Sequence, residues 1–487
     1  MKLLVKNLGP IRGNTQTIDL SKRFYIFVGP NNSGKTYVSQ LLWTIFNEGV
    51  IKKFAAETEI DFEEESSVEI TDELLCKVLG KYADFLKQEL VTNTFNIKNA
   101  SILDKVDFSF SWNLEEIERQ EFKLNFNVSA GEHQEIEYIV GHKEKNSLLI
   151  NFNTKTLPEK FLDIVPKTRV EADVRQGIKS LLLPTIIQFL LKQDSQIFFL
   201  PASRVFYPTF YQYIYEIDRR KREEGMMRLL DIIEENNRKN TQVDIKSVEK
   251  LNLFKRPYTA PMNHVLEQIF SLNKEANIVP HYKNLLEQLA KIMGGDIVLK
   301  RLEGIGPVEF FFNFGEEGRD LPMYLASSSV NQLTLLYLYF KYWVAEKKNF
   351  LMIDEPEENL HPENQIYLLE LLIKFATQNE NKVLITTHSP LMANAINNYI
   401  YLDFLRNDLK CDIERIVEDH NLKYLSTDAS ISKNDVGVYF FNGKRIIDYG
   451  TDYYGAYFRD FREITNAQEE SIRTLIDYIY LQEDEDE

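Results

Sequence analysis

The chain has 487 residues, of which 44% are hydrophobic and 12% aromatic, and its formal net charge is −17. This apolar content is sufficient for the cores of two or three domains and excludes a largely disordered chain, which would be poor in aromatic residues. The excess of acidic residues argues against a protein that coats nucleic acid through its overall charge, although a local basic stripe could still bind it.

The cysteine content and the apolar runs indicate the compartment. Cys76 and Cys411 lie far apart in sequence, so they indicate neither a disulfide framework nor a cysteine-based zinc site. The N-terminal apolar run is too short for the core of a signal peptide. The longest apolar stretches, 181–191 and 333–344, are too short to span a bilayer. We therefore expect a reduced, cytoplasmic protein with no membrane partner.

The strongest pattern is a phosphate-binding loop between a strand and a helix. Residues 24–28 form an apolar strand pattern, and a helical pattern begins after residue 36. The loop between them matches G-x-x-x-x-G-K-[ST] and consists of Gly29, Pro30, Asn31, Asn32, Ser33, Gly34, Lys35 and Thr36. Its glycines let main-chain N–H groups turn toward phosphates, next to the positive end of the helix dipole. The motif predicts that Lys35 contacts the β- and γ-phosphates of ATP and that Thr36 binds Mg²⁺.

A long region follows the loop and exceeds what one strand-and-helix layer needs. It begins with a cluster of acidic residues between Glu57 and Glu73, followed by a helical pattern over 74–89. Alternating apolar residues over 106–152 predict antiparallel strands, and helices are expected over 170–191. A large insertion is therefore expected within an α/β domain.

Residues 196–200 again have the pattern of a buried strand, which leads into Pro201 and Arg204. Residues 208–293 are helical and charged, but too broken for a long coiled coil. The basic run 219–222 is flanked by acidic residues, which favours a solvated, ion-paired helix face over a phosphate-binding surface. Strands are expected over 297–314.

Two later strands end in polar residues. Residues 349–353 lead into Asp354 and Glu355, and residues 383–387 lead into His388. A carboxylate at the end of a buried strand can hold Mg²⁺ through its water shell, the role expected of Asp354. Glu355 is then the candidate general base, and His388 could hydrogen-bond the γ-phosphate. A common acidic turn and a structural histidine are the alternatives.

These motifs together resemble the ABC-type ATPases: the phosphate-binding loop, the D-E-P-E-x-x-L-H-P sequence of residues 354–362, and a strand that ends in T-H-S-P. The L-H-P sequence is similar to the overcoming-lysogenization-defect (OLD)-like branch, often described as AAA ATPases of prokaryotic defence. Transporters carry Asp where His361 stands. The resemblance implies an α/β fold, with an ABC-type P-loop ATPase core and a large inserted region of helices and antiparallel strands.

The resemblance also implies a signature loop, matched by residues 325–332, that meets the γ-phosphate of nucleotide bound to a partner subunit. Ser328 and Ser329 would contact this nucleotide, and the loop 357–361, which includes Asn359 and His361, would lie across the dimer interface. Relatives usually carry Gly where Ser329 stands, which weakens the expectation of a close phosphate approach. Arg204 is placed near the nucleotide or the interface. A serine-rich helix cap and an ordinary salt-bridged arginine are the alternatives.

Six segments follow from these patterns. The ATPase core is expected in residues 1–50, 196–208 and 294–410, the insertions in 51–195 and 209–293, and a hairpin, helix and acidic tail in 411–487. The hairpin, over 436–447, is expected to pack on the core. The acidic tail 483–487 is expected to be disordered. The resemblance to OLD-like proteins raises the question of a C-terminal Toprim nuclease domain, which needs a Glu at one strand end and an Asp-x-Asp at another. The segment 398–487 offers neither in a strand pattern.

The preferred hypothesis is an ATPase that binds and hydrolyses ATP with Mg²⁺ at a homodimer interface. It would act as the sensor or regulatory subunit of a prokaryotic antiviral system. Its other partners would be a separate effector, such as a nuclease or toxin, and a viral trigger protein. The alternatives are a DNA repair or recombination ATPase that binds duplex ends, and a nucleotide-binding scaffold that hydrolyses little. Nucleic-acid binding is left open.

Overall fold

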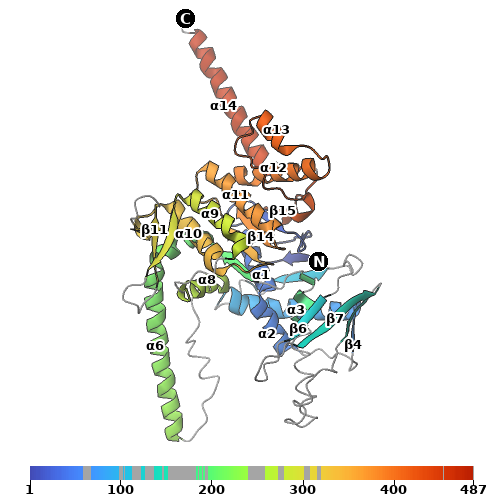
Figure 1. Ribbon diagram of the computed structural model, residues 1–487, viewed down its shortest axis with the longest axis vertical. Coiled ribbons are helices and arrows are strands. Elements are labelled where there is room, and N and C mark those ends of the chain that lie inside the picture. The colour runs from blue at the N-terminus through green and yellow to red at the C-terminus, as the bar shows by residue number, and fades with distance from the viewer. Residues whose placement is uncertain are drawn as a thin grey trace. The chain divides into compact units, whose positions relative to one another are not determined.

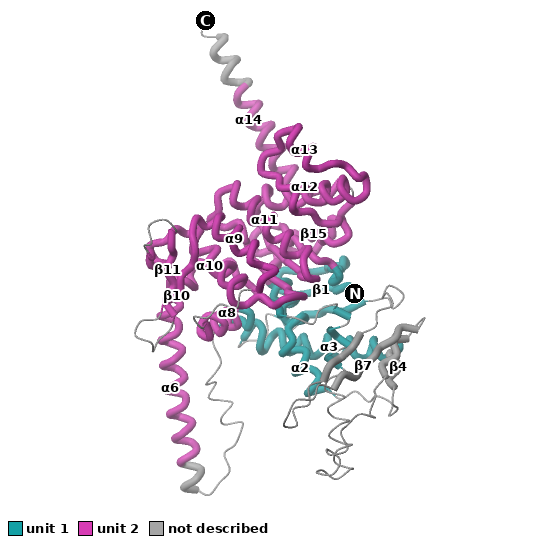
Figure 2. Tube along the Cα trace, viewed as in Figure 1, with its two compact units in different colours: residues 1–21, 37–197, 258–261 teal, residues 22–36, 198–257, 262–487 magenta. Residues whose placement is uncertain are grey.

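The computed structural model describes most of the chain as two compact units (Figure 2). Unit 1 comprises residues 1–21, 37–197 and 258–261, and unit 2 comprises residues 22–36, 198–257 and 262–487. This division cuts the chain at residues 21 and 36 rather than at residue 50, and the six predicted segments stay predictions. The described residues are 1–58, 67–97, 103, 105–111, 122–126, 136–144, 147–151, 183–184, 186–188, 190–191, 196–239, 258–272, 279–300, 308–314, 320–452 and 454–485.

A six-stranded sheet in the order β16-β15-β3-β14-β13-β9 carries the phosphate-binding loop. The pairs β15–β3, β3–β14 and β14–β13 are parallel, and β16 is antiparallel to β15. Every residue of β3, β13 and β14 is buried, as expected of strands covered on both faces. The strands are β3 Phe24–Val28, β9 Ile197–Leu200, β13 Phe350–Asp354, β14 Lys382–Thr387, β15 Val436–Phe441 and β16 Ile446–Asp448.

The register of the parallel strands brings three chain segments to one edge of the sheet. Thr387 pairs with Val28, and Asp354 pairs with Thr386. The loops that follow β3, β13 and β14 therefore start side by side, because parallel strands end at the same edge. The α/β P-loop fold predicted for this core is confirmed.

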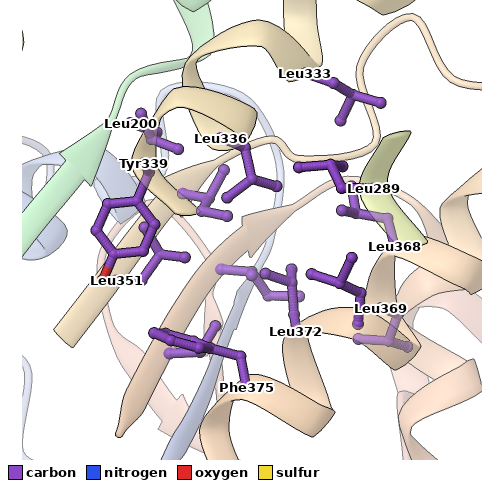
Figure 3. Close-up of a cluster of buried hydrophobic side chains, with 14 of the residues drawn as sticks. Leu200, Leu289, Leu333, Leu336, Tyr339, Leu351, Leu368, Leu369, Leu372 and Phe375 are labelled. Carbon is purple, nitrogen blue, oxygen red and sulfur yellow. The ribbon is translucent and has the colours of Figure 1, made fainter. Parts of the chain in front are cut away.

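A leucine-rich core holds helices against this sheet in unit 2. Figure 3 shows side chains from several strands and helices meeting there, among them Leu289, Leu336, Leu351 and Leu372, which are at most 2% exposed. Burying each leucine contributes about 1.5 to 3 kcal/mol. The helices are α9 Lys283–Met293, α10 Ser328–Leu338 and α11 Pro362–Thr377, with α12 Pro390–Asn407 following β14 (Figure 1).

The C-terminal hairpin is part of the sheet itself. β15 and β16 form the predicted hairpin, and its association with the core goes beyond packing, because β15 pairs directly with β3. β15 is buried along its whole length and continues the apolar pattern of the parallel strands. Its end also lies under the phosphate-binding loop, as the Phe441 carbonyl beside Gly29 shows.

Unit 2 also contains helices α6 Tyr207–Lys239, α13 Ile413–Asp419 and α14 Arg459–Glu485, most of α8 Ala260–Phe270, and an antiparallel sheet of β10 Asp296–Lys300, β11 Glu309–Asn313 and β12 Asp320–Pro322. On α6, Arg219 pairs with Glu216 and Glu223, and Arg222 pairs with Asp218. The interpretation of this basic run as an ion-paired helix face is therefore confirmed.

Helix α14 extends away from the body of unit 2 (Figure 1), and residues 462–476 are all exposed. The prediction of a disordered tail is wrong for residues 483–485, which continue α14. The preceding run carries a helical apolar pattern that includes Ile472, Leu475 and Ile476, and the helix propagates from it into the acidic end. Residues 486–487 lie outside the described part of the chain. None of the described helices is long and apolar enough to cross a membrane.

Unit 1 consists of helices and two antiparallel sheets. One sheet has the order β2-β1-β5, with β1 Lys2–Lys6, β2 Thr17–Asp19 and β5 Asp107–Ser111. The other has the order β4-β8-β7-β6, with β4 Ser67–Thr71, β6 Phe122–Phe126, β7 Ile136–Glu144 and β8 Ser147–Asn151. The helices are α2 Glu48–Glu57, α3 Asp72–Glu89 and the part of α1 Lys35–Phe46 that follows Thr36.

The antiparallel strands predicted over 106–152 are confirmed, although β5 pairs with the N-terminal β1 instead of joining β6 to β8. Of the predicted helices over 170–191, only short pieces between Leu183 and Leu191 are described. Most of the acidic cluster 57–73, at residues 59–66, lies outside the described residues. So does the glycine-containing part of the predicted strands over 297–314.

Gly29→Ala should destabilise the protein, because a Cβ at residue 29 would lie 2.2 Å from the Phe441 carbonyl oxygen and the backbone has a φ of +142°. We expect a loss of about 3 kcal/mol in the free energy of unfolding, measured by urea denaturation. Gly443→Ala is the matched control. Its φ is +86°, but among the described residues no atom lies within 4 Å of the new Cβ, so about 1 kcal/mol is expected. Equal losses in the two variants would contradict the close approach.

Candidate nucleotide site

The phosphate-binding loop follows β3 in a conformation that depends on its glycines. Gly29 and Gly34 have φ values of 142° and 104°, and Asn32 has 58°. Glycine adopts such angles without a steric penalty, and asparagine tolerates the left-handed region better than most residues. Ser33 is 2% exposed, and its hydroxyl oxygen has no hydrogen-bond partner among the described residues. The loop thus encloses a buried polar atom that a phosphate oxygen could bond.

Lys35 begins α1 and turns back over the loop. Its Nζ donates to the carbonyl oxygens of Gly29 and Pro30, at 2.8 and 3.0 Å, and lies 3.1 Å from His388 Nε2. Burial lowers the pKa of Lys35 to about 8, and the nearby carboxylates of Glu355, Asp354 and Glu357 oppose this shift. An anionic ligand beside Nζ would stabilise the ammonium form further.

Asp354 ends β13 beside the phosphate-binding loop. It is 3% exposed, its Oδ1 accepts a hydrogen bond from Thr386 Oγ1 at 3.0 Å, and it also hydrogen-bonds the side chain of Thr36. Burial raises the pKa of Asp354 to about 6, although the two threonine hydroxyls lower it. The two residues predicted to bind Mg²⁺, Thr36 and Asp354, are therefore in direct contact.

This pair suits a magnesium ion that is shared with a phosphate ligand. Mg²⁺ prefers oxygen ligands and is commonly held by one or two carboxylates together with substrate phosphates. Among the described residues, no group of three or more His, Cys, Asp or Glu side chains could hold a metal by itself. The chemistry of the donor set therefore fits a nucleotide-bound Mg²⁺ better than an all-protein metal site.

Glu355 and His388 face each other across the site. Glu355 Oε1 lies 3.2 Å from His388 Nε2, and this interaction lowers the pKa of Glu355. The side chains are 35% and 31% exposed, so a water molecule can reach the carboxylate. The same Nε2 lies close to Lys35, and the tautomer of His388 decides which of the two contacts is the hydrogen bond.

Glu357, expected only as part of the interface loop 357–361, has a role inside the site that the sequence analysis missed. Its Oε1 accepts three hydrogen bonds, from Thr387 Oγ1 at 2.6 Å, His388 N at 2.8 Å and Ser389 N at 3.1 Å. It therefore fixes the main chain that carries His388. Its place in the acidic motif beside Asp354 is the sequence signal that could have indicated this role.

Arg204 is deeply buried behind the Asp354–Glu355 turn. It is 1% exposed and bonds the main-chain carbonyl oxygens of both acidic residues. The alternative of an ordinary salt-bridged arginine does not describe these contacts, because the hydrogen bonds that its guanidinium makes among the described residues all go to main-chain carbonyl oxygens. Arg204 therefore lies next to the acidic turn of the candidate nucleotide site, and its expected position near a dimer interface stays a prediction.

The remaining predicted residues lie at helix starts. Ser327 caps α10 by accepting from Val330 N at 3.3 Å, and its Oγ lies 2.9 Å from that of Ser329. Ser328 is the exposed first residue of this helix. His361 caps α11 through Nδ1, and Asn359 has a φ of 62° in the exposed loop before it. These serines therefore do cap a helix, and the cap leaves an exposed helix N-terminus at Ser328.

Comparison with known proteins agrees with this site. A family described as the AAA ATPase domain matches residues 1–393, so the chain belongs to that family. An OLD nuclease of Thermus scotoductus is 35% identical over 65 residues, which cover 13% of this chain and 12% of that nuclease. The family match places the chain in the AAA ATPase domain family, and the short stretch of similarity to an OLD nuclease agrees with the resemblance found in the sequence.

Solved structures with a similar chain trace include SMC heads. The Smc head of Pyrococcus furiosus with an extended coiled coil, bound to the C-terminal domain of ScpA, is 14% identical with a TM-score of 0.32, over 97% of this chain and 98% of that one. The SMC head domain from Thermotoga maritima is 12% identical with a TM-score of 0.28, over 92% and 97%.

The raised pKa of Asp354 predicts a pH dependence of stability that Asp354→Asn removes. Because the folded-state pKa of about 6 lies above the ordinary 3.8, the protonated acid is favoured in the fold. This contribution is complete below pH 3.8 and is lost as the pH rises through 6. Without nucleotide or Mg²⁺, the wild type should lose about 2 to 3 kcal/mol of unfolding free energy relative to Asp354→Asn between pH 4 and pH 8.

Denaturant unfolding at the two pH values measures this difference. The control is Asp408→Asn, which alters an exposed aspartate at the end of α12 and should give no comparable difference. Parallel pH profiles for the wild type and Asp354→Asn would show that Asp354 ionises in the fold as easily as an exposed carboxylate.

Proposed function

We propose that this site binds and hydrolyses ATP with Mg²⁺. The observation that carries the proposal is the meeting, at one sheet edge, of the phosphate-binding loop with Lys35, the Thr36–Asp354 pair, and the Glu355–His388 pair. The buried Ser33 hydroxyl without a partner and the glycine cradle of the loop fit a phosphate group. Bound ATP with Mg²⁺ would supply the reactive phosphoanhydride and neutralise its charge.

Each protein group has a distinct part in this reaction. The loop N–H groups and Lys35 would hold the phosphates, and Thr36 and Asp354 would hold the metal, which would neutralise the phosphate charge. Glu355 orients the attacking water and accepts its proton. Its lowered pKa makes it ionised but a weak base, so positioning contributes more than proton affinity. His388 keeps the carboxylate in place and offers a donor to the terminal phosphate.

We further propose that two copies associate around the nucleotide. Ser328 lies at an exposed helix N-terminus, which is an anion-binding position, and is preceded by Tyr324 and Leu325, which are 71% and 60% exposed. In the ABC-type arrangement that the motifs resemble, Ser328 and Ser329 of one copy would meet the nucleotide of the other. Asn359 and His361 lie in an exposed loop that suits the same interface.

The cellular role proposed is that of a sensor or regulatory subunit in a prokaryotic antiviral system. The similarity to an OLD nuclease supports this role. In the described part of residues 398–487, no strand carries the Glu or Asp-x-Asp ends that a Toprim nuclease needs. We propose that the effector, a nuclease or toxin, is a separate chain, and that a viral protein is the trigger.

Glu355→Gln should lower the rate of phosphate release by about 100-fold or more, because the amide cannot accept the proton of the attacking water. ATP binding should be retained, since the phosphate-binding loop is untouched. The variant should accumulate as an ATP-bound dimer or larger oligomer. Steady-state phosphate release and light scattering after size exclusion, with and without ATP and Mg²⁺, measure the two effects.

Glu418→Gln is the matched control, because this glutamate is exposed on α13. It should release phosphate at the wild-type rate. If Glu355→Gln and the wild type hydrolyse ATP equally fast, Glu355 is not the base. If the wild type binds ATP but is as slow as the variant, the weakly hydrolysing scaffold is favoured, in line with Ser329 in the signature position.

The DNA-repair alternative predicts duplex binding that weakens steeply with salt. Because Arg219 and Arg222 of the basic run are already paired with carboxylates, we expect little retention of duplex DNA in a filter-binding titration from 50 to 200 mM salt. Strong retention with a steep negative salt slope would instead support the DNA-binding alternative.

A further inference from the structure

Arg204 connects three segments of unit 2 through main-chain carbonyl oxygens. It lies in the 3-10 turn Ala202–Phe206 after β9. Nε donates to Gln332 O at 3.1 Å, Nη2 to Glu355 O at 3.0 Å, and Nη1 to Pro201 O at 3.2 Å and also to Asp354 O. One guanidinium therefore spans the signature helix α10 and the end of β13.

This arrangement requires a buried guanidinium rather than any cation. Burial lowers the pKa of Arg204 to about 10, opposed first by Glu358 and then by Asp354, so the group stays charged at neutral pH. The planar fork of arginine directs several donors to separate acceptors, and hydrogen bonds from a charged donor are strong. A lysine at this position would keep the charge, but its single nitrogen cannot reproduce the fork.

These hydrogen bonds fix the backbone conformation of Glu355. Its φ of 49° places a residue with a Cβ in the left-handed region, a backbone conformation that such residues adopt only at a steric cost. Its N–H donates to Thr386 O at 3.0 Å, and its carbonyl oxygen accepts from Arg204. Because both sides of the residue are held, the carboxylate stays directed toward His388.

A second contact links the same helix and turn. Gln332 Nε2 donates to Glu358 Oε2 at 3.2 Å, three residues after Glu355. Gln332 is 0% exposed, and its main-chain carbonyl oxygen accepts the hydrogen bond from Arg204 Nε. The first turns of α10 and the turn that carries Glu355 are thus joined by main-chain and side-chain hydrogen bonds. A displacement of α10 would act directly on the position of Glu355.

We propose that Arg204 is a positioning residue, which ties the signature helix α10 to the Glu355 turn and so holds the Glu355 carboxylate in its working orientation. This inference rests on the proposed ATPase function and specifies how that site is assembled. Arg204 does not contact the nucleotide in this role. It makes the geometry of the candidate base depend on the helix whose exposed N-terminus carries Ser328 and Ser329.

The test compares Arg204→Lys and Arg204→Gln with the wild type, and uses Arg219→Lys on the exposed face of α6 as the control. Steady-state phosphate release gives kcat and KM, and a fluorescent ATP analogue gives the nucleotide Kd. For Arg204→Lys we expect kcat to fall about tenfold or more while KM and Kd change less than about threefold, because the variant misplaces the base and leaves the phosphate-binding loop intact. Arg204→Gln should lose more activity, and Arg219→Lys none.

A measurement that does not depend on hydrolysis is hydrogen–deuterium exchange. In both Arg204 variants, exchange should accelerate about tenfold or more in a peptide covering residues 354–360 and stay unchanged in one covering residues 29–36. Unchanged exchange at 354–360, an equal change in both peptides, or loss of folding in both variants would overturn the assignment. If the wild type releases no phosphate, the proposed function fails, while the exchange comparison still decides the role of Arg204.

Discussion

The parallel pairing of β3, β14 and β13 is the constraint on which the site depends. Residues that are hundreds of positions apart reach one sheet edge only because these three strands run in the same direction and in the observed register. A slip of one residue in β13 would turn Asp354 to the other face of the sheet and break its bonds to Thr36 and Thr386. The buried leucines between the sheet and helices α9 to α11 make such a slip costly.

Two charged side chains at this sheet edge are largely shielded from solvent. Lys35 and Asp354 are both buried, and burial moves the pKa of each toward neutrality, to about 8 and about 6. Both shifts are penalties that a nucleotide with its metal would relieve, since phosphate favours the ammonium and Mg²⁺ favours the carboxylate. The fold thus bears the desolvation cost of these two buried charges, whereas the lowered pKa of the more exposed Glu355 keeps its carboxylate ionised.

The layers around the reacting groups are connected by main-chain hydrogen bonds. Glu357 gathers the N–H groups of the loop that carries His388, and Arg204 gathers the carbonyl groups of the turn that carries Glu355. The carboxylate of Glu357 thus accepts hydrogen bonds from the N–H groups of one loop, and the guanidinium of Arg204 donates hydrogen bonds to the carbonyl groups of the other. Each loop is exposed enough to meet water, and each is anchored by a charged side chain that bonds its backbone.

The sequence by itself determined the strands and the chemistry at their ends, because apolar runs, glycine spacing and the acidic motif each act locally. The phosphate-binding loop, Asp354, Glu355 and His388 could all be recognised in this way. Only the tertiary structure decided what depends on residues distant in the chain. It placed β15 inside the central sheet, paired β5 with the N-terminal strand, and carried α14 into the acidic tail. The contacts of Glu357 and Arg204 were also decided only by the tertiary structure, because their partners are backbone N–H and C=O groups. Every residue carries such groups, so no side-chain pattern in the sequence indicates which of them a buried charge will bond.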